Sequence, residues 1–425
     1  MVDFDTSTLF IVAGLAIMIG FVANYLFHRF KAPDVLIIML FGFLVGPSAF
    51  GVIGAEVTDM VKGLVPYVSA LALAFIMFNG GLELDLHEVR YSARTTLMLA
   101  VGGIELVIIL VSTILFFSLG IPLHYAVLGG VAFGSTSAPT VIPMIANLGC
   151  SRRIKTVLTL ESAITDTLVI GIGTTLVVYF SQEGASLTDT TFGFLLSLGV
   201  SFIIGMLSSL AWARLLPFLQ GFKYYYLLTL GVLLLLYALC EIIAPYGGGV
   251  IVVLVFGLML NNAHHISGLL PRSFKQPLLS DEFKVLNEEA AFFIKVFFFT
   301  FLGLYISTID FQVIYLIIGV IVFIAIFLIR LAMTHLVSER AKMDDTERMM
   351  LHTMFPRGLC TVVTALLPLS YGLDIGDAQQ ALVGIVATVV VLTTLLASFG
   401  AYITERRICQ IRKGEEKEDF SIPEF

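Results

Sequence analysis

The sequence predicts an all-α polytopic membrane protein of thirteen transmembrane helices, built as two inverted repeats with broken helices in spans five and twelve. Three observations predict this fold class. Of the 425 residues, 58% are hydrophobic and only 13% are charged, whereas soluble domains carry about 25% charged residues. Apolar runs of membrane-spanning length recur along the chain. The basic residues collect at alternating ends of these runs.

Each predicted span is an apolar run near the length of about 20 residues that a helix needs to cross a bilayer. The first run begins behind the acidic residues Asp3 and Asp5, without the basic residues or the cleavage site of a signal peptide, so it predicts a retained span. The approximate limits of the thirteen runs, good to about two to four residues, are 7–28, 33–52, 63–82, 95–119, 122–149, 154–181, 190–213, 224–244, 247–263, 288–308, 312–337, 347–371 and 378–404.

The lysines and arginines orient these spans. With the N-terminus outside, the cytoplasmic ends hold all of the 24 basic residues except Lys62, Lys295, Arg330 and Arg357. Because cytoplasmic loops are enriched in basic residues, this asymmetry predicts a multi-pass cell (plasma) membrane protein with its N-terminus outside and its C-terminus in the cytoplasm. Residues 1–412 then form the membrane domain, and residues 413–425 form a short polar cytoplasmic tail.

The sequence does not indicate an enzyme, a cofactor or a nucleic-acid partner. It lacks a GxGxxG motif and a P-loop. Its cysteines stand singly, without the spacing of zinc or redox sites, at Cys150, Cys240, Cys360 and Cys409. In a chain this apolar, the expected partners are membrane lipid and small ions.

Two of the spans are interrupted. Span five contains Gly-Ser-Thr-Ser-Ala-Pro-Thr at residues 134–140, and span twelve contains Pro-Arg-Gly at residues 356–358. The two spans lie seven apart, and an odd offset gives them opposite orientations in the membrane, as in an inverted repeat. Interrupted helices at corresponding positions indicate the substrate site of a transporter.

Span six carries two carboxylates, Glu161 and Asp166, in an otherwise apolar run of about 28 residues. Asp166 lies about 18 Å into the helix, near the membrane midplane. An ionisable residue at that depth is a functional-site hypothesis by default. Asp166 is therefore the first candidate for binding a transported ion.

Oxygen atoms are predicted to gather around Asp166. Pro139 lacks a backbone donor and frees carbonyl groups upstream in span five, where Thr136 and Ser137 add hydroxyl groups. Ser162 lies four residues before Asp166 and shares its helix face. This set predicts a site for a small monovalent metal cation at Asp166, Ser162 and Thr136. The alternative is that the small hydroxyl residues pack helices together.

Glu161 needs a cationic partner, because an unpaired buried charge costs several kcal/mol. Arg330, Lys295 and Arg357 lie at depths that can reach it, and depth alone does not choose between them. Arg330 could pair bidentately, and Lys295 could instead extend to the membrane interface. A paired Glu161 would leave Asp166 as the one free carboxylate. If Asp166 bound a proton and a monovalent cation in turn, it would exchange one for the other without moving net charge.

The motif Glu161-Ser-Ala-Ile-Thr-Asp166 resembles the E-S-x-x-N-D of the monovalent cation:proton antiporter superfamily, and the NhaP-like sodium/proton antiporters are the most similar members. Residues 356–358 resemble the arginine-glycine motif of its span twelve. The stretch 298–304 followed by Arg330 resembles its spans ten and eleven. The resemblance covers essentially the whole chain.

This resemblance implies a homodimeric antiporter that exchanges Na⁺ or Li⁺ for H⁺ by alternating access. It implies that Asp166 carries the ion or the proton and selects Arg330 as the partner of Glu161. It also implies dimerisation helices and a six-helix ion-carrying bundle, which we expect at about residues 63–181 and 288–404. Arg357 and Pro139 are expected to support the site.

The chain departs from the family pattern at three places. Ser137 follows Thr136 where the family has an acidic residue, Asn79 stands where many members have an acid, and Thr165 replaces Asn or Asp before the carrier Asp166. A single carboxylate favours electroneutral exchange of one cation for one proton. One alternative is a K⁺/H⁺ antiporter, because these departures leave the choice among sodium, lithium and potassium open. The other alternative is a cation channel.

Overall fold

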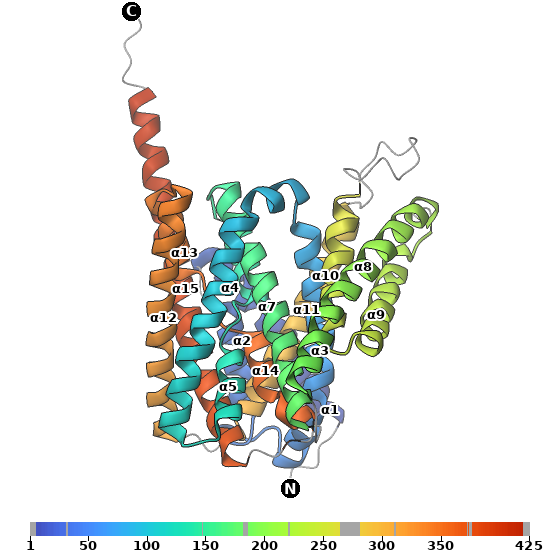
Figure 1. Cartoon of the computed structure of the whole chain (residues 1–425), viewed down its shortest axis with the longest axis vertical. Helices are drawn as coiled ribbons and strands as arrows, with labels where there is room; N and C mark the ends of the chain where they lie inside the picture. Colours follow the sequence, from blue (N-terminus) through green and yellow to red (C-terminus); the bar gives the residue numbers. More distant parts are fainter. Residues whose placement is uncertain are drawn as a thin grey trace, which may run out of the picture.

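The computed structural model describes residues 6–419 except 31–32, 147, 182–185, 220–221, 264–280, 310–311, 372 and 374–375. Every regular element in this described part is an α-helix, which confirms the all-α prediction (Figure 1). The helices are α1 Thr6–Phe30, α2 Asp34–Val45, α3 Ala55–Glu83, α4 Leu86–Leu119, α5 Leu123–Ala132, α6 Ala138–Ala146, α7 Arg152–Ser181, α8 Leu187–Leu219, α9 Tyr225–Ile243, α10 Gly248–Asn261, α11 Asp281–Ile306, α12 Val313–Ala341, α13 Asp345–Thr353, α14 Leu359–Ser370 and α15 Asp377–Asp419.

Eight helices of the described part are long and apolar enough to cross a membrane: α1, α4, α7, α8, α9, α11, α12 and α15. Shorter apolar helices lie at Asp34–Val45, Tyr67–Glu83, Leu123–Ala132, Gly248–Asn261 and Leu359–Pro368. Several helices continue past the predicted apolar runs. The C-terminal part of α15, drawn in red, extends beyond the ends of the other helices (Figure 1). It takes up most of the predicted tail 413–425, of which residues 420–425 lie outside the described part.

Polar capping residues explain why some helices start outside the apolar runs. The side chain of Asp85 accepts a hydrogen bond of 2.7 Å from the backbone N–H of His87, which starts α4 about two turns before the apolar run. Gly120, with φ of 62°, ends the same helix in the left-handed conformation that glycine tolerates. At α13, Asp344 and Glu347 form a reciprocal capping box.

The helices pack as two groups. In the first group, α2 packs on α1 and α11, α3 packs on α10 and α11, and α8 and α9 pack on α10. In the second group, α4 packs on α5, α7 and α12, α15 packs on α12 and α13, and α14 packs on α5 and α7. The short helix α6 packs on α7 and also contacts α3 of the first group. Residues 63–83 and 288–306, which the expected ion-carrying bundle includes, thus lie on α3 and α11 and pack mainly in the first group.

Glycines bring α2 and α11 of the first group into backbone contact. A Cβ atom on Gly42 would overlap the carbonyl oxygen of Thr300, and one on Gly303 would overlap that of Met39. Small residues allow this close approach between membrane helices. The contacts advance in step along both helices, because Gly42 faces Thr300 and Gly46 faces Ser307. The two helices therefore run parallel and form one tightly packed unit.

Two buried segments without helical structure lie in the second group. Residues 133–137 separate α5 from α6, and residues 354–358 separate α13 from α14. The segments touch each other, because the backbone N–H of Ser137 donates a hydrogen bond of 2.8 Å to the carbonyl of Pro356. A Cβ on Gly358 would overlap the hydroxyl of Ser137, so only glycine fits there. The two segments meet next to the middle of α7 and position the candidate site.

Candidate functional site

The side chain of Asp166, on α7, contacts the N-terminal end of α6 and has no exposed surface. Its Oδ2 accepts a hydrogen bond of 3.1 Å from the backbone N–H of Ala138, the first residue of α6. The positive end of a helix dipole favours a carboxylate at this position. Pro139 follows in the first turn, where its missing N–H removes no helical hydrogen bond. Oδ1 has no hydrogen-bond partner among the described residues, so this atom can accept a bond from an ion or a proton.

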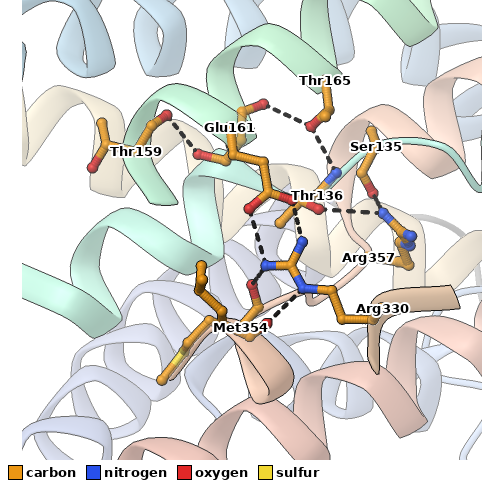
Figure 2. Close-up of polar contacts among 10 residues, drawn as sticks. Ser135, Thr136, Thr159, Glu161, Thr165, Arg330, Met354 and Arg357 are labelled. Atoms are coloured by element: carbon orange, nitrogen blue, oxygen red, sulfur yellow. Dashed lines mark hydrogen bonds and ion pairs between the residues drawn. The ribbon is translucent and has the colours of Figure 1, made fainter. Parts of the chain in front are cut away.

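Thr165 ties α7 to the segment before α6. Its hydroxyl accepts a hydrogen bond of 2.9 Å from the backbone N–H of Thr136 and donates one of 3.1 Å to the carbonyl of Ser162 (Figure 2). The hydroxyl of Ser162 donates to the carbonyl of Thr159 at 2.9 Å. The structure thus brings Thr136, Ser162 and Thr165 to the same part of α7 as Asp166. All of these side chains are buried.

Arg357 comes from the segment between α13 and α14 and contacts the segment that precedes α6. Its guanidinium donates to the carbonyl of Ser135 and, at 3.4 Å, to the hydroxyl of Thr136 (Figure 2). Its backbone N–H donates to the hydroxyl of Thr393 on α15 at 3.0 Å. Non-helical backbone leaves carbonyl groups that need partners at membrane depth, and Arg357 supplies one for Ser135.

Glu161, one turn before Asp166 on α7, pairs with Arg330 of α12 through two hydrogen bonds. Arg330 Nη2 lies 3.0 Å from Glu161 Oε2, and Nη1 contacts Oε1 (Figure 2). The guanidinium also donates to the carbonyls of Leu351 at 2.6 Å and Met354 at 3.2 Å, at the end of α13. The structure therefore pairs Glu161 with Arg330, and the same guanidinium holds the start of the segment 354–358.

Lys295 has a different partner, which the sequence did not indicate. Its Nζ lies 2.7 Å from Oδ2 of Asp34, at the start of α2, and 8% of the residue is exposed. Lys295 therefore does not pair with Glu161. Asp34 stands at the edge of an apolar run, where an interfacial carboxylate is ordinary, so its sequence position gives no signal of a buried pair.

Asn79 and Ser137 have their side chains bonded elsewhere. The Asn79 amide donates to Glu83 at 3.1 Å and accepts from Asn287 at 2.8 Å. Ser137 shares a hydrogen bond of 3.0 Å with the hydroxyl of Thr140. Among the described residues, neither side chain is hydrogen-bonded to Asp166.

A cavity of about 530 Å³ lies between the two groups of helices and reaches the site. Its wall includes Ala138 and Pro139 at the start of α6, next to the backbone N–H that holds Asp166. Its other polar and charged lining residues are Asn24, Asn79, Glu83, Glu288, Glu289 and Lys295. The cavity therefore joins the surroundings of Asp166 to a region rich in carboxylates.

The donors at the site are oxygen atoms with one carboxylate, which suits a small hard cation. The described residues contain no group of three or more His, Cys, Asp or Glu side chains that could hold a metal ion.

The interpretation of Asp166 as the one free intramembrane carboxylate requires correction, because it overlooked Glu105. This residue lies at the centre of the apolar segment Arg90–Leu119 of α4. It is exposed and has no hydrogen-bond or ion-pair partner among the described residues. Its neighbours on the exposed face of α4 are apolar, among them Val101, Leu106 and Ile109. A single acid inside an apolar run was visible in the sequence and was the signal that could have found it.

Comparison with known proteins defines the family. The family model "Sodium/hydrogen exchanger, transmembrane" matches residues 14–403, so the chain belongs to this family and is a multi-pass membrane protein. The particular fold is that of MjNhaP1, the sodium proton antiporter of Methanocaldococcus jannaschii. Its structure at pH 8 superimposes with a TM-score of 0.75 at 21% sequence identity, covering 92% of this chain and 99% of that one.

Two relatives show how the sequence similarity is spread. The Na⁺/H⁺ antiporter 1 of M. jannaschii is 25% identical over 259 residues, which cover 59% of this chain and 59% of the relative. The K⁺/H⁺ antiporter NhaP2 of Shewanella oneidensis is 23% identical over 259 residues, which cover 60% of this chain and 44% of the relative. The chain thus matches about half the length of these relatives.

Proposed function

We propose that this protein is a secondary active antiporter that exchanges a monovalent cation for H⁺ across the cell membrane. One observation carries the proposal. A fully buried carboxylate, Asp166, is held on one oxygen by the N-terminus of α6, while its other oxygen lacks a partner in the described structure. Family membership supports it. Such a group can bind a proton or a cation, but not both at once.

The proposed membrane arrangement has thirteen spans, with the N-terminus outside and the C-terminus in the cytoplasm. In this arrangement α5 with α6 forms the broken span five, and α13 with α14 forms the broken span twelve. The hydrogen bond between Ser137 and Pro356 supports the view that the two breaks correspond to each other in inverted repeats. The cavity beside α6 and α11 then opens to the cytoplasm.

In the proposed mechanism, Asp166 binds the cation with help from oxygen atoms of Ser162 and Thr136, and releases it when a proton arrives. Thr165 and Arg357 hold the segment 133–137 in place. The Glu161–Arg330 pair is neutral in every state and acts as a structural tie. Asp166 then alternates between two forms of equal charge, so one cation exchanges for one proton. Ser137, Asn79 and Pro139 shape the surroundings and the approach of the ion.

The proposed moving unit is the second group of helices, α4–α7 and α12–α15. It carries Asp166, both breaks and the Glu161–Arg330 pair, and its contacts with the first group are sparse by comparison. The first group would stay fixed and form the homodimer interface. Movement of one group against the other would close the cavity on one side of Asp166 and open a path on the other.

The proposed cation is Na⁺ or Li⁺, with K⁺ as a second candidate. The sodium/hydrogen exchanger model and the Na⁺/H⁺ antiporter of M. jannaschii favour Na⁺. The similarity to a K⁺/H⁺ antiporter of S. oneidensis supports the second candidate. A cation channel is a third and weaker alternative, and it would pass current in a planar bilayer where an electroneutral exchanger passes none.

The test is transport in proteoliposomes under an imposed proton gradient, with Na⁺, Li⁺ and K⁺ compared. Asp166→Asn should reduce exchange to the rate of protein-free liposomes. Glu105→Gln is the matched control, because it removes another intramembrane acid outside the site and should keep exchange. Full exchange by Asp166→Asn would refute the carrier assignment. A rate that follows the membrane voltage would refute one-for-one exchange.

A further inference from the structure

The first group of helices contains a second buried ion pair, which the proposed carrier site does not use. Lys295 Nζ lies 2.7 Å from Asp34 Oδ2, and each side chain is only 10% exposed. Asp34 Oδ1 accepts a hydrogen bond of 2.8 Å from the backbone N–H of Val35, in the first turn of α2. The carboxylate is therefore held by the start of a helix and by an ammonium at once.

The packing of α2 on α11 fixes this pair. The two helices run parallel, with Gly42 against Thr300 and Gly303 against Met39. Asp34 and Lys295 precede these contacts by about two turns on their own helices. The close contact of the two helices keeps these two side chains next to each other.

Lys295 also lies on the wall of the cavity of about 530 Å³ that reaches the start of α6. It is the only basic residue among the described residues that line this cavity. The acidic lining residues are Glu83, Glu288 and Glu289. A cation that approaches Asp166 through the cavity would pass the ammonium of Lys295. The positive charge of this ammonium is balanced by Asp34, which lies behind the cavity wall.

We propose that Asp34 is a positioning residue for cation entry. By pairing with Lys295 it neutralises the ammonium and holds it against α2, so the cavity keeps the negative charge of its glutamates. A charged, low-dielectric cavity of this kind raises the local concentration of the attracted ion. This inference rests on the proposed function, because it takes the cavity as the route of the cation to Asp166.

Asp34→Asn is the first variant, because the amide is isosteric but leaves the ammonium uncompensated. The KM for the cation should rise about two- to sixteenfold, the effect of one unit charge about 10 Å from an ion at effective dielectric constants of about 80 to 20. The rate at saturating cation should change less than KM. Choline chloride should shrink the effect, because salt screens charges that face water.

The double variant Asp34→Asn/Lys295→Gln separates charge from structure. It removes both charges and keeps side chains of similar size, so its KM should return to within about twofold of the original value. A purely structural role predicts instead that Asp34→Asn lowers protein yield and maximal rate at unchanged KM, without rescue by the second substitution. That outcome would overturn the proposal. Glu339→Gln is the control, because it removes the acid of an exposed pair with His335 on α12, which does not line the cavity.

A second readout separates this inference from the proposed function. Cation-dependent thermal stabilisation of the purified protein gives an apparent Kd for Na⁺, Li⁺ and K⁺ without transport. If the unaltered protein exchanges or binds a cation and Asp34→Asn leaves both KM and Kd unchanged, only the role of Asp34 is refuted. If the unaltered protein neither exchanges nor binds these cations, the proposed function fails and the inference fails with it.

Discussion

Removal of one partner of the Glu161–Arg330 pair is expected to destabilise the protein more than any other single neutralising substitution in the site. Arg330 donates four hydrogen bonds, two to Glu161 and two to the carbonyls of Leu351 and Met354. Glu161→Gln leaves a buried guanidinium without a counter-charge. Breaking a buried pair in this way costs about 3–5 kcal/mol, against a total stability of about 5–15 kcal/mol for a typical protein.

The assay is a double-mutant cycle on purified protein, with the free energy of unfolding measured by denaturant titration in detergent. Glu161→Gln, Arg330→Gln and the double variant are compared with the unaltered chain. Because the double variant buries no unpaired charge, it should lose less than the sum of the two single losses, with a coupling energy of at least about 2 kcal/mol. Additive losses, or a loss below about 1 kcal/mol in Glu161→Gln, would refute the reasoning.

Four further predictions follow from the described contacts. The apparent KM for the cation should fall as pH rises, because protons compete for Asp166; a KM that is constant across pH in proteoliposomes would contradict competition at one carboxylate. Arg357→Lys should lower the maximal rate, because an ammonium cannot hold both the Ser135 carbonyl and the Thr136 hydroxyl as a guanidinium does; an unchanged rate would remove this role. Gly303→Ala should destabilise the protein by about 1–3 kcal/mol, because the added methyl group would overlap Met39. Gly14→Ala is the control, because nothing lies near Gly14, and it should not destabilise the protein. Equal effects of the two substitutions would count against close packing of α2 on α11. Glu105→Leu should raise stability by up to about 3 kcal/mol, because it replaces a carboxylate on an apolar face; a loss of stability would imply a partner for Glu105.

The sequence predicted those features that depend on local residue type. The apolar run from Ile154 to Ser181 matches α7 to within two residues. The motifs at 134–140 and 356–358 mark the places where helical structure stops. Proline, glycine and small hydroxyl residues interrupt a helix by their own chemistry, so no knowledge of tertiary contacts was needed.

Features that depend on which helices pack together were beyond the sequence. Depth in the membrane allowed three partners for Glu161, and the folded structure places the guanidinium of Arg330, on α12, against its carboxylate. Asp34 and Lys295 lie 261 positions apart, and nothing in either run indicates that α2 and α11 pack side by side. The membership of α3 and α11 in one helix group or the other depends likewise on glycine contacts between distant segments.

The carboxylate of Glu105 has a consequence for the bilayer itself. It lies midway along the apolar segment of α4, on an exposed face flanked by aliphatic side chains. A polar group at that depth favours the entry of water and local thinning of the bilayer. We expect a dimple in the membrane beside α4. Because α4 belongs to the proposed moving group, the dimple would travel with each transport cycle.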